Sequence, residues 1–280
     1  MATARVIIVD TNDGAFIGDA VESALRQTVS CEVVIVDNAS TDGSAERLAS
    51  IPGVRVIPRA SNEGFGAAVN TGAADTTTEF IALLNPDAQA SPEWLTTITQ
   101  WMNEQGVDVA CSYVAAGDGY YFTRGRFWRW LGGATDDRTP STDERTDFVN
   151  GCALVIRSDV FRRLGGFDEG FFLYCDDVDL SLRAIALGYR IRVCPRTLVR
   201  HDHHGSSTKA LGSRKWLHVF ASRGRLVAKH CRNLTLPVAF IVQAFIVPVR
   251  FAGGVRAARP LIRAVFKGYF GYRRETRAHP

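Results

Sequence analysis

Three carboxylates stand together at the start of an otherwise apolar helical pattern. Asp176, Asp177 and Asp179 lie within four residues of one another. The dipole of the helix would favour a single acid at this end by about 0.3–1 kcal/mol. Three acids repel one another, so we expect a metal ion, another cation or a proton to be abstracted to offset the repulsion. The cluster alone is compatible with a structural or a catalytic role, and the rest of the chain favours catalysis.

Further polar residues that could bind a ligand follow apolar, strand-like runs. The run at 33–36 is followed by Asp37, whose carboxylate could accept a hydrogen bond from the imide N–H of a pyrimidine base. The run at 80–84 is followed by Asn85-Pro86-Asp87. Asp87 could hold Mg²⁺ or Mn²⁺, since carboxylates and pyrophosphate are the usual surroundings of these ions. Asn-Pro-Asp is also an ordinary turn sequence, so this signal is weak by itself.

The elements that must position these residues alternate between β-branched runs and helical patterns. The predicted strands are 5–9, 32–36, 54–57 and 80–84, and the helices that follow them are 15–27, 44–50, 65–74 and 92–103. This alternation predicts an α/β fold with a mostly parallel, doubly wound sheet. Ligands of such sheets bind at the carboxyl ends of the strands, so the polar residues there should converge on one crevice.

The middle of the chain departs from this alternation. Residues 112–146 are rich in glycine, aromatic and charged residues and have no clear period. We predict an irregular, mobile excursion over the site, whose aromatic rings stack on sugars, lie at a membrane surface or pack in a small satellite core. Regular structure is predicted to resume with a strand at 148–156 and a helix near 158–164.

Composition and missing motifs narrow the class of protein. The chain has 280 residues, 46% of them hydrophobic and 22% charged, which is typical of a soluble-type α/β protein with one large domain and an appendage. Six cysteines without metal-ligand spacing, and no signal peptide before Val6, favour a reducing cytosol. No G-x-G-x-x-G follows the first strand and no G-x-x-x-x-G-K-[ST] occurs, which argues against dinucleotide enzymes and P-loop nucleotidases.

The net charge of +4 conceals a division into two regions. Residues 1–205 contain 18 Lys and Arg against 28 Asp and Glu, a net charge of −10, whereas residues 206–280 contain 15 against one, a net charge of +14. We therefore predict a domain at 1–205 and a basic helical region at 206–280. A basic region of this strength indicates an anionic partner, either nucleic acid or a membrane surface.

The basic region begins with an apolar run at 234–249, interrupted by Pro237, Gln243 and Pro248. Sixteen residues are short for a membrane span, so a re-entrant or interfacial helix on the inner leaflet suits them better. The alternative is an amphipathic helix packed on the domain or on a second subunit. Nucleic acid is disfavoured because the aromatic residues do not alternate with the basic ones.

A histidine-rich segment lies at the boundary between the two regions. His201, His203 and His204 fall within four positions, and their spacing does not fit a structural zinc site. One of them could complete a metal site with Asp87. Exposed loop residues would explain the segment equally well.

Together these segments resemble the inverting family-2 glycosyltransferases of the GT-A fold, over roughly residues 4–232. The match includes Val36-Asp37-Asn38-Ala39-Ser40-Thr41-Asp42-Gly43-Ser44, Asn62-Glu63-Gly64-Phe65-Gly66, Leu84-Asn85-Pro86-Asp87, Asn150-Gly151-Cys152, Gly165-Gly166-Phe167-Asp168-Glu169 and Asp176-Asp177-Val178-Asp179-Leu180. The chain looks most like the rhamnosyltransferase branch, in which Asn-Pro-Asp replaces the usual Asp-x-Asp. Its Asp176 stands where that branch has Glu.

The resemblance implies roles for individual residues. Asp177 would be the catalytic base, and Asp176 and Asp179 would contact the acceptor. Asp87 and His201 would bind Mg²⁺ or Mn²⁺. The nucleotide would be held by a set of polar residues at the strand ends: Thr11, Asn12, Asp37, Asn62 and Asn85.

The resulting expectation is a metal-dependent, inverting glycosyltransferase. It would move a sugar, L-rhamnose from dTDP-rhamnose by resemblance, onto a lipid-linked or cell-envelope glycan at the cytoplasmic membrane face. No Gln-x-x-Arg-Trp occurs after residue 200, so transfer should be non-processive. The alternatives are a UDP-hexose or UDP-furanose transferase of the same fold and a non-catalytic sugar-nucleotide binding module. A homo-oligomer is compatible with the sequence.

Overall fold

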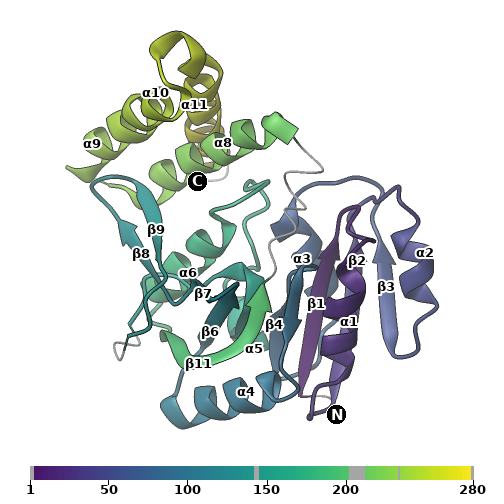
Figure 1. Cartoon of the computed structure of the whole chain (residues 1–280). Helices are drawn as coiled ribbons and strands as arrows, with labels where there is room; N and C mark the ends of the chain where they lie inside the picture. Colours follow the sequence, from purple (N-terminus) through teal and green to yellow (C-terminus); the bar gives the residue numbers. More distant parts are fainter. Residues whose placement is uncertain (1–2, 142–144, 202–211, 233, 279–280) are drawn as a thin grey trace.

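The computed structural model describes residues 3–141, 145–201, 212–232 and 234–278. A twisted sheet flanked by helices forms the larger part of the molecule, and a group of C-terminal helices lies across one end of it (Figure 1). The predicted boundary at residue 205 falls outside the described residues, and so do His203 and His204.

The main sheet has nine strands in the order β3-β2-β1-β4-β10-β6-β11-β5, with β7 paired to β6. Strands β1 to β4 are parallel, as is the pair β6 and β11, whereas β10, β5 and β7 run antiparallel to their neighbours. The strands are β1 (Ala4–Asp10), β2 (Cys31–Asp37), β3 (Val54–Pro58), β4 (Phe80–Leu83), β5 (Ala88–Ala90), β6 (Val109–Ala116), β7 (Gly119–Phe122), β10 (Leu154–Arg157) and β11 (Ile191–His201).

Helices cover both faces of this sheet, which explains the composition of its central strands. Every residue of β1 and β4 is buried, and the Val and Ile runs of β1 and β2 are what a strand buried on both faces requires. The flanking helices are α1 (Ile17–Leu25), α2 (Ser44–Ala49), α3 (Phe65–Ala73), α4 (Trp94–Gln105), α5 (Ser158–Arg163) and α6 (Asp176–Ala186). The predicted alternation over the first hundred residues and the mostly parallel sheet are therefore confirmed.

The order of the strands reverses beside β1. The chain passes from β1 outward to β2 and β3 and then returns to place β4 on the other side of β1. A crevice forms at the carboxyl ends of the strands at such a switch point, and it is the usual ligand site of these sheets. Asp10 ends β1, and Asn85 follows β4 closely, so the polar residues that follow the strands lie at this end of the sheet.

Residues 112–146 differ from the expected irregular excursion. The regular elements in the described part of this segment begin with the last residues of β6, which are followed by β7. A separate two-stranded sheet of β8 (Arg124–Trp128) and β9 (Gly133–Asp137) comes next. The prediction of irregular structure was wrong because β6 pairs with β7 and β8 with β9 in two hairpins, and an aromatic-rich sequence shows little periodicity. The strand expected at 148–156 is also shorter, since a 3₁₀ turn at Gly151–Ala153 precedes β10.

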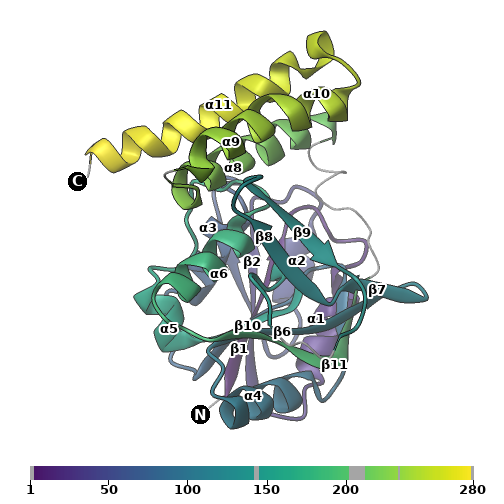
Figure 2. The ribbon, with the colours of Figure 1, turned by 90° about the vertical axis from the view of Figure 1, so that its left-hand side faces the viewer.

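The C-terminal helices are α8 (Lys215–His230), α9 (Thr235–Ile241), α10 (Val247–Ala252) and α11 (Val255–Ala278), and a π-helical turn at Val242–Ile246 joins α9 to α10. Figure 2 shows α11 lying along α8 above the sheet domain. Glycines allow this close packing: a Cβ atom on Gly224 would lie 2.0 Å from the carbonyl oxygen of Val265, and one on Gly268 would lie 1.8 Å from that of Ala221. The region is therefore a packed helical unit.

Candidate active site

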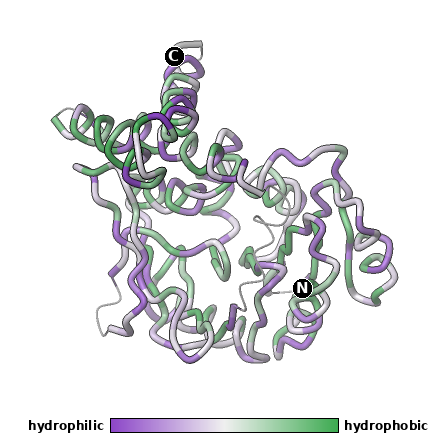
Figure 3. The backbone as a smooth tube through the Cα atoms, turned by 45° about the horizontal axis from the view of Figure 1, so that its top comes forward, coloured by the Kyte–Doolittle hydropathy of each residue, from purple (hydrophilic) through white to green (hydrophobic). Residues whose placement is uncertain are grey.

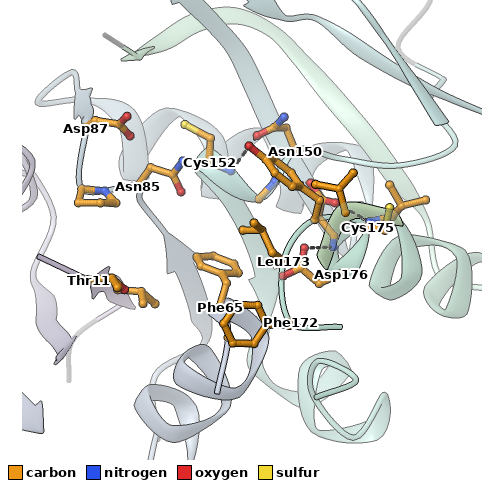
Figure 4. A pocket seen from close by; sticks show the side chains of 18 of the residues that line it. Thr11, Phe65, Asn85, Asp87, Asn150, Cys152, Phe172, Leu173, Cys175 and Asp176 are labelled. Atoms are coloured by element: carbon orange, nitrogen blue, oxygen red, sulfur yellow. Dashed lines mark hydrogen bonds between the residues drawn. The ribbon is translucent and has the colours of Figure 1, made fainter. Parts of the chain in front are cut away.

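A pocket of about 520 Å³ lies at the carboxyl ends of β1 and β4. Its other walls are the loop before α6, the β7 and β9 strands and one side of α8. Figure 4 shows Asn85 and Asp87 on one side of the pocket and Cys175 and Asp176 on the other. Seven of the predicted site residues line it: Thr11, Asn62, Asn85, Asp87, Asp176, Asp177 and His201.

Asp177 is held at the first turn of α6 by two backbone amides. The amide of Gly151 donates a 3.1 Å hydrogen bond to its Oδ2 atom, and that of Val178 donates a 2.8 Å bond to Oδ1. Burial raises the pKa of Asp177 above its ordinary value. A carboxylate that is fixed in place and has a raised pKa is suited to take a proton from a bound hydroxyl.

Asp176 lies beside Asp177 and is buried more deeply. Burial and the neighbouring charge of Asp177 both raise the pKa of Asp176. Its Oδ1 atom accepts a hydrogen bond from the amide of Asp177, and its Oδ2 atom is buried with no hydrogen-bond partner among the residues that the structure describes. This free oxygen is compatible with the expected contact to an acceptor.

Backbone strain accompanies these acids. Tyr174 and Cys175, which directly precede α6, have φ angles of 62° and 67°. Side chains disfavour this left-handed region, and such residues often mark functional sites. The turn they make directs the start of α6 at the pocket.

Asp87 and His201 are brought together by strand pairing. His201 pairs with Ala88 in the register of β11 and β5. This pairing places Asp87, the residue before Ala88, next to the imidazole. His201 Nε2 lies 3.1 Å from Asp87 Oδ1 and 3.3 Å from the Nδ2 atom of Asn85. Tyr121 stacks on the imidazole at 4.8 Å between ring centroids.

This pair fits a divalent cation of the magnesium or manganese type. A carboxylate oxygen and an imidazole nitrogen suit Mn²⁺, and Mg²⁺ is commonly held by one or two carboxylates and by the phosphates of a substrate. The described residues contain no group of three or more His, Cys, Asp or Glu side chains placed to hold a metal. Asp87 and His201 would therefore bind an ion that is shared with a substrate.

Two of the expected nucleotide-binding residues do not line the pocket. Asn12 accepts a 2.7 Å hydrogen bond from the amide of Thr41, and Asp37 accepts a 2.9 Å bond from the amide of Ser40. Asn12 therefore joins the loop after β1 to the loop after β2, whereas Asp37 stabilises the turn that directly follows β2. Contact of Asp37 with a base stays a prediction, as does the nucleotide-binding role of Asn12.

Asp179 has a different place from the one expected. Its side chain has no exposed surface, and it does not line the pocket. Arg183 Nε and His230 Nε2 each lie 2.7 Å from its carboxylate, and Lys229 Nζ lies 2.8 Å away. We therefore correct the expected acceptor contact: Asp179 faces the opposite side of α6 from the pocket and joins that helix to α8.

Several lining residues were missed in the sequence. Asp13 follows the first strand and could have been found by the same reasoning as Asp37. It is buried, which raises its pKa to about 7, and its Oδ1 atom has no hydrogen-bond partner among the described residues. Asp136, Trp216 and Arg223 come from β9 and α8, and no local sequence signal places these elements at the site.

Comparison with known proteins agrees with this geometry. The profile of Glycosyl transferase family 2 matches residues 5–165, more than half of the chain. The chain belongs to glycosyltransferase family 2. It is therefore a glycosyltransferase, and the matched residues include the strands of the main sheet other than β11, the Asn-Pro-Asp turn and the 3₁₀ turn at Gly151–Ala153.

Similar proteins include two curated bacterial transferases. The chain is 27% identical to N-acetylglucosaminyl-diphospho-decaprenol L-rhamnosyltransferase of Mycobacterium tuberculosis, over 63% of this chain and 67% of that protein. It is 22% identical to the dTDP-rhamnosyl transferase RfbF of Shigella flexneri, over 65% of this chain and 63% of that protein. The chain thus spans about two thirds of the length of these relatives.

Among solved structures, the chain is similar to GalNAc-T7, crystallised with UDP, GalNAc and Mn²⁺. The two superpose with a TM-score of 0.61 at 19% identity, over 72% of this chain and 43% of that one. This likeness shows a shared mixed α/β fold of the GT-A type.

Proposed function

We propose that this family-2 transferase moves one sugar per encounter from a nucleotide donor to an acceptor hydroxyl, with inversion at the anomeric carbon. The observation that carries the proposal is Asp177, a carboxylate held by two amides in the pocket, with a pKa raised by burial. A sugar-nucleotide binding module has no need of such a base, so the geometry supports catalysis over binding alone.

The proposed reaction needs one base and no covalent intermediate. Asp177 takes the proton of the acceptor hydroxyl. At the same time the hydroxyl oxygen bonds to the anomeric carbon from the face opposite the leaving group. The bond between that carbon and the diphosphate oxygen breaks, and the nucleoside diphosphate leaves with the electron pair. The amides of Gly151 and Val178 orient the base throughout.

A divalent cation fits the other side of the pocket. Asp87 and His201 would hold it, and Asn85 would orient His201 through their 3.3 Å contact. When bound, the cation would neutralise the charge of the departing diphosphate. The Mn²⁺ of the structurally similar GalNAc-T7 supports this choice of ion.

The donor and acceptor are proposed from the relatives. A rhamnosyl donor is supported by both bacterial relatives, and dTDP by the name of the Shigella protein. The tuberculosis relative acts on a lipid-linked diphosphate, which supports an acceptor of that class. A UDP-hexose or UDP-furanose donor is the alternative, since the pocket geometry does not distinguish these sugars.

The test is a donor screen with purified full-length protein. Hydrolysis of dTDP-, UDP- and GDP-sugars would be followed by release of the nucleoside diphosphate, with Mg²⁺ or Mn²⁺ present. The proposal predicts turnover of dTDP-rhamnose above all other donors. Preference for a UDP-sugar would favour the alternative, and no hydrolysis or transfer with any donor would contradict the proposed function.

We further propose that the C-terminal helices attach the protein to the cytoplasmic face of a membrane. By length and composition alone, one described segment, Thr235–Ala252, could cross a bilayer: its mean hydropathy is 1.8 and 22% of it is buried. Figure 3 shows hydrophobic colouring along these helices. Large apolar side chains are exposed here: Leu234, Val238, Ile241, Phe245, Ile246, Phe251 and Val255.

The way this segment packs favours a position in the interface over a span. Ala239, Gln243 and Ala244 are buried, and Gln243 donates a 2.7 Å hydrogen bond to the carbonyl of Leu131 in the loop between β8 and β9. One side of the segment therefore packs against the rest of the protein. Trp130 in the same loop and Trp128 at the end of β8 are also exposed, and tryptophan is a residue type that prefers membrane interfaces.

Charge favours the bilayer over a second protein copy as the partner of this surface. Exposed basic residues lie in α10 and α11 of the same C-terminal region: Arg250, Arg256, Arg259, Arg263, Lys267, Arg273 and Arg274. Two copies of such a surface would repel each other. An anionic leaflet attracts it by about 1 kcal/mol for each Lys or Arg near the lipid.

A further inference from the structure

The helix α8 connects the pocket with the apolar surface of the C-terminal region. Trp216, Val219 and Arg223 line the pocket, and they come from one side of this helix. The 2.9 Å hydrogen bond from Ser222 Oγ to the carbonyl of Leu173 fixes α8 to the loop that precedes Asp176. The wall made by α8 is therefore part of the same site as the proposed base.

The charges in the pocket single out Arg223. The carboxylates that line it are those of Asp13, Asp87, Asp136, Asp176 and Asp177. Within the described residues, Arg223 is the one Arg or Lys side chain that lines it. An anionic group that approaches past these acids needs a cation, and a guanidinium is well suited to phosphate oxygens.

Arg223 is held at the junction with the apolar helices. Its Nη1 atom donates a 3.3 Å hydrogen bond to Oε1 of Gln243, which lies in the π-helical turn between α9 and α10. π-Helical turns are rare in proteins, and those that occur often lie at functional sites. Gln243 thus ties the guanidinium to the segment with the exposed apolar side chains.

An apolar path leads outward from the same wall. The ring of Trp216 lies 4.5 Å from that of Phe251 between centroids, and Phe251 on α10 is exposed. Trp216 therefore joins the pocket to the apolar outer surface. A ligand with a charged head at Arg223 could rest its hydrocarbon chain along Trp216 and Phe251.

From this arrangement we propose that Arg223 and Trp216 form a subsite for a diphosphate attached to a long apolar chain, the head of a lipid-linked acceptor. The subsite is separate from the donor pair of Asp87 and His201. The inference deepens the proposed function, on which it rests for the identity of the acceptor.

Direct binding tests the subsite without any need for turnover. Farnesyl diphosphate serves as a soluble probe, titrated by calorimetry into full-length protein that is saturated with dTDP and Mg²⁺ so that the donor site is filled. We expect the wild type to bind the probe and the R223Q variant to bind it at least tenfold more weakly. Farnesol, which lacks the phosphates, should bind both proteins equally weakly.

Two further variants distinguish the loss of the Arg223 side chain from a general loss of positive charge. R223K keeps the positive charge and should recover part of the affinity. R232Q removes an equal charge from an exposed position that does not line the pocket, and it should bind the probe as the wild type does. Circular dichroism would verify that each variant is folded.

Three results would overturn the inference: no binding by the wild type, equal binding by R223Q, or binding of the probe only when dTDP is omitted, which would place it at the donor site. A failure of the donor screen would reject the proposed function and leave this binding measurement unaffected. Successful transfer together with equal binding by R223Q would reject the subsite alone.

Discussion

The ammonium group of Lys229 lies 2.8 Å from the Oδ1 atom of Asp179, and this contact joins α8 to α6, the helix whose first turn carries the proposed base. Asp179 is completely buried and also contacts Arg183 and His230. Burial by itself would raise the pKa of Asp179, but the hydrogen bond from His230 and the charges of Arg183 and Lys229 outweigh it and lower the pKa. The ionised carboxylate therefore stabilises the junction of the two helices.

We expect Asp179→Asn to lower the free energy of unfolding by about 3–5 kcal/mol, because it leaves buried cations without their partner. A lowered carboxyl pKa gives stability that is present above the ordinary value of about 3.9 and is lost as the pH falls through the lower folded value. The loss should therefore be fully present at pH 7, well above both carboxyl pKa values, when it is measured by urea unfolding. The exposed Asp159→Asn is the control, and equal stability of both variants would refute the structural role.

A second prediction concerns the pH dependence of transfer. Burial raises the pKa of Asp177, so the base loses its charge at a higher pH than an ordinary carboxyl with a pKa of about 3.9. The rate at saturating substrates should fall on the acid side, with a midpoint above this value. A rate that stays constant down to pH 4.5 would contradict the assignment of a buried base.

The cation site gives a third prediction. EDTA should abolish transfer, and Asp87→Ala and His201→Ala should each raise the metal concentration for half-maximal rate at least tenfold. Gln89→Ala is a matched control in β5, because its amide donates to Asp19 and does not line the pocket. Full activity in chelator would show that the protein handles the diphosphate without a metal.

A fourth prediction tests membrane attachment. The double variant Ile241→Ser and Phe245→Ser removes exposed apolar surface and spares the buried Gln243. We expect the wild type to float with anionic liposomes at low salt, more weakly at physiological salt, and the double variant to remain soluble. Leu187→Ser, at the far end of α6, is the control for loss of an exposed apolar residue. A wild type that stays soluble at both salts would contradict membrane attachment.

The sequence predicts those parts of this structure that depend on local patterns. Apolar runs and the polar residues after them identify β1, β2 and β4 and place Thr11, Asn85 and Asp87 at one crevice. Spacing alone cannot tell Asp177 from Asp179, because which side of α6 faces the pocket depends on packing against α8. Arg223 lies 46 residues after Asp177 and reaches the site only through that packing.

The role of Asp177 is the central claim, and the transfer rate of Asp177→Asn tests it most directly. The amide keeps the size of the side chain and loses its basicity. With dTDP-rhamnose and a short-chain N-acetylglucosaminyl-diphospho-prenol both saturating, we expect kcat to fall about a hundredfold or more, while the Kd for dTDP stays within about twofold of the wild type. A variant that keeps half of the wild-type kcat would contradict the assignment of Asp177 as the base.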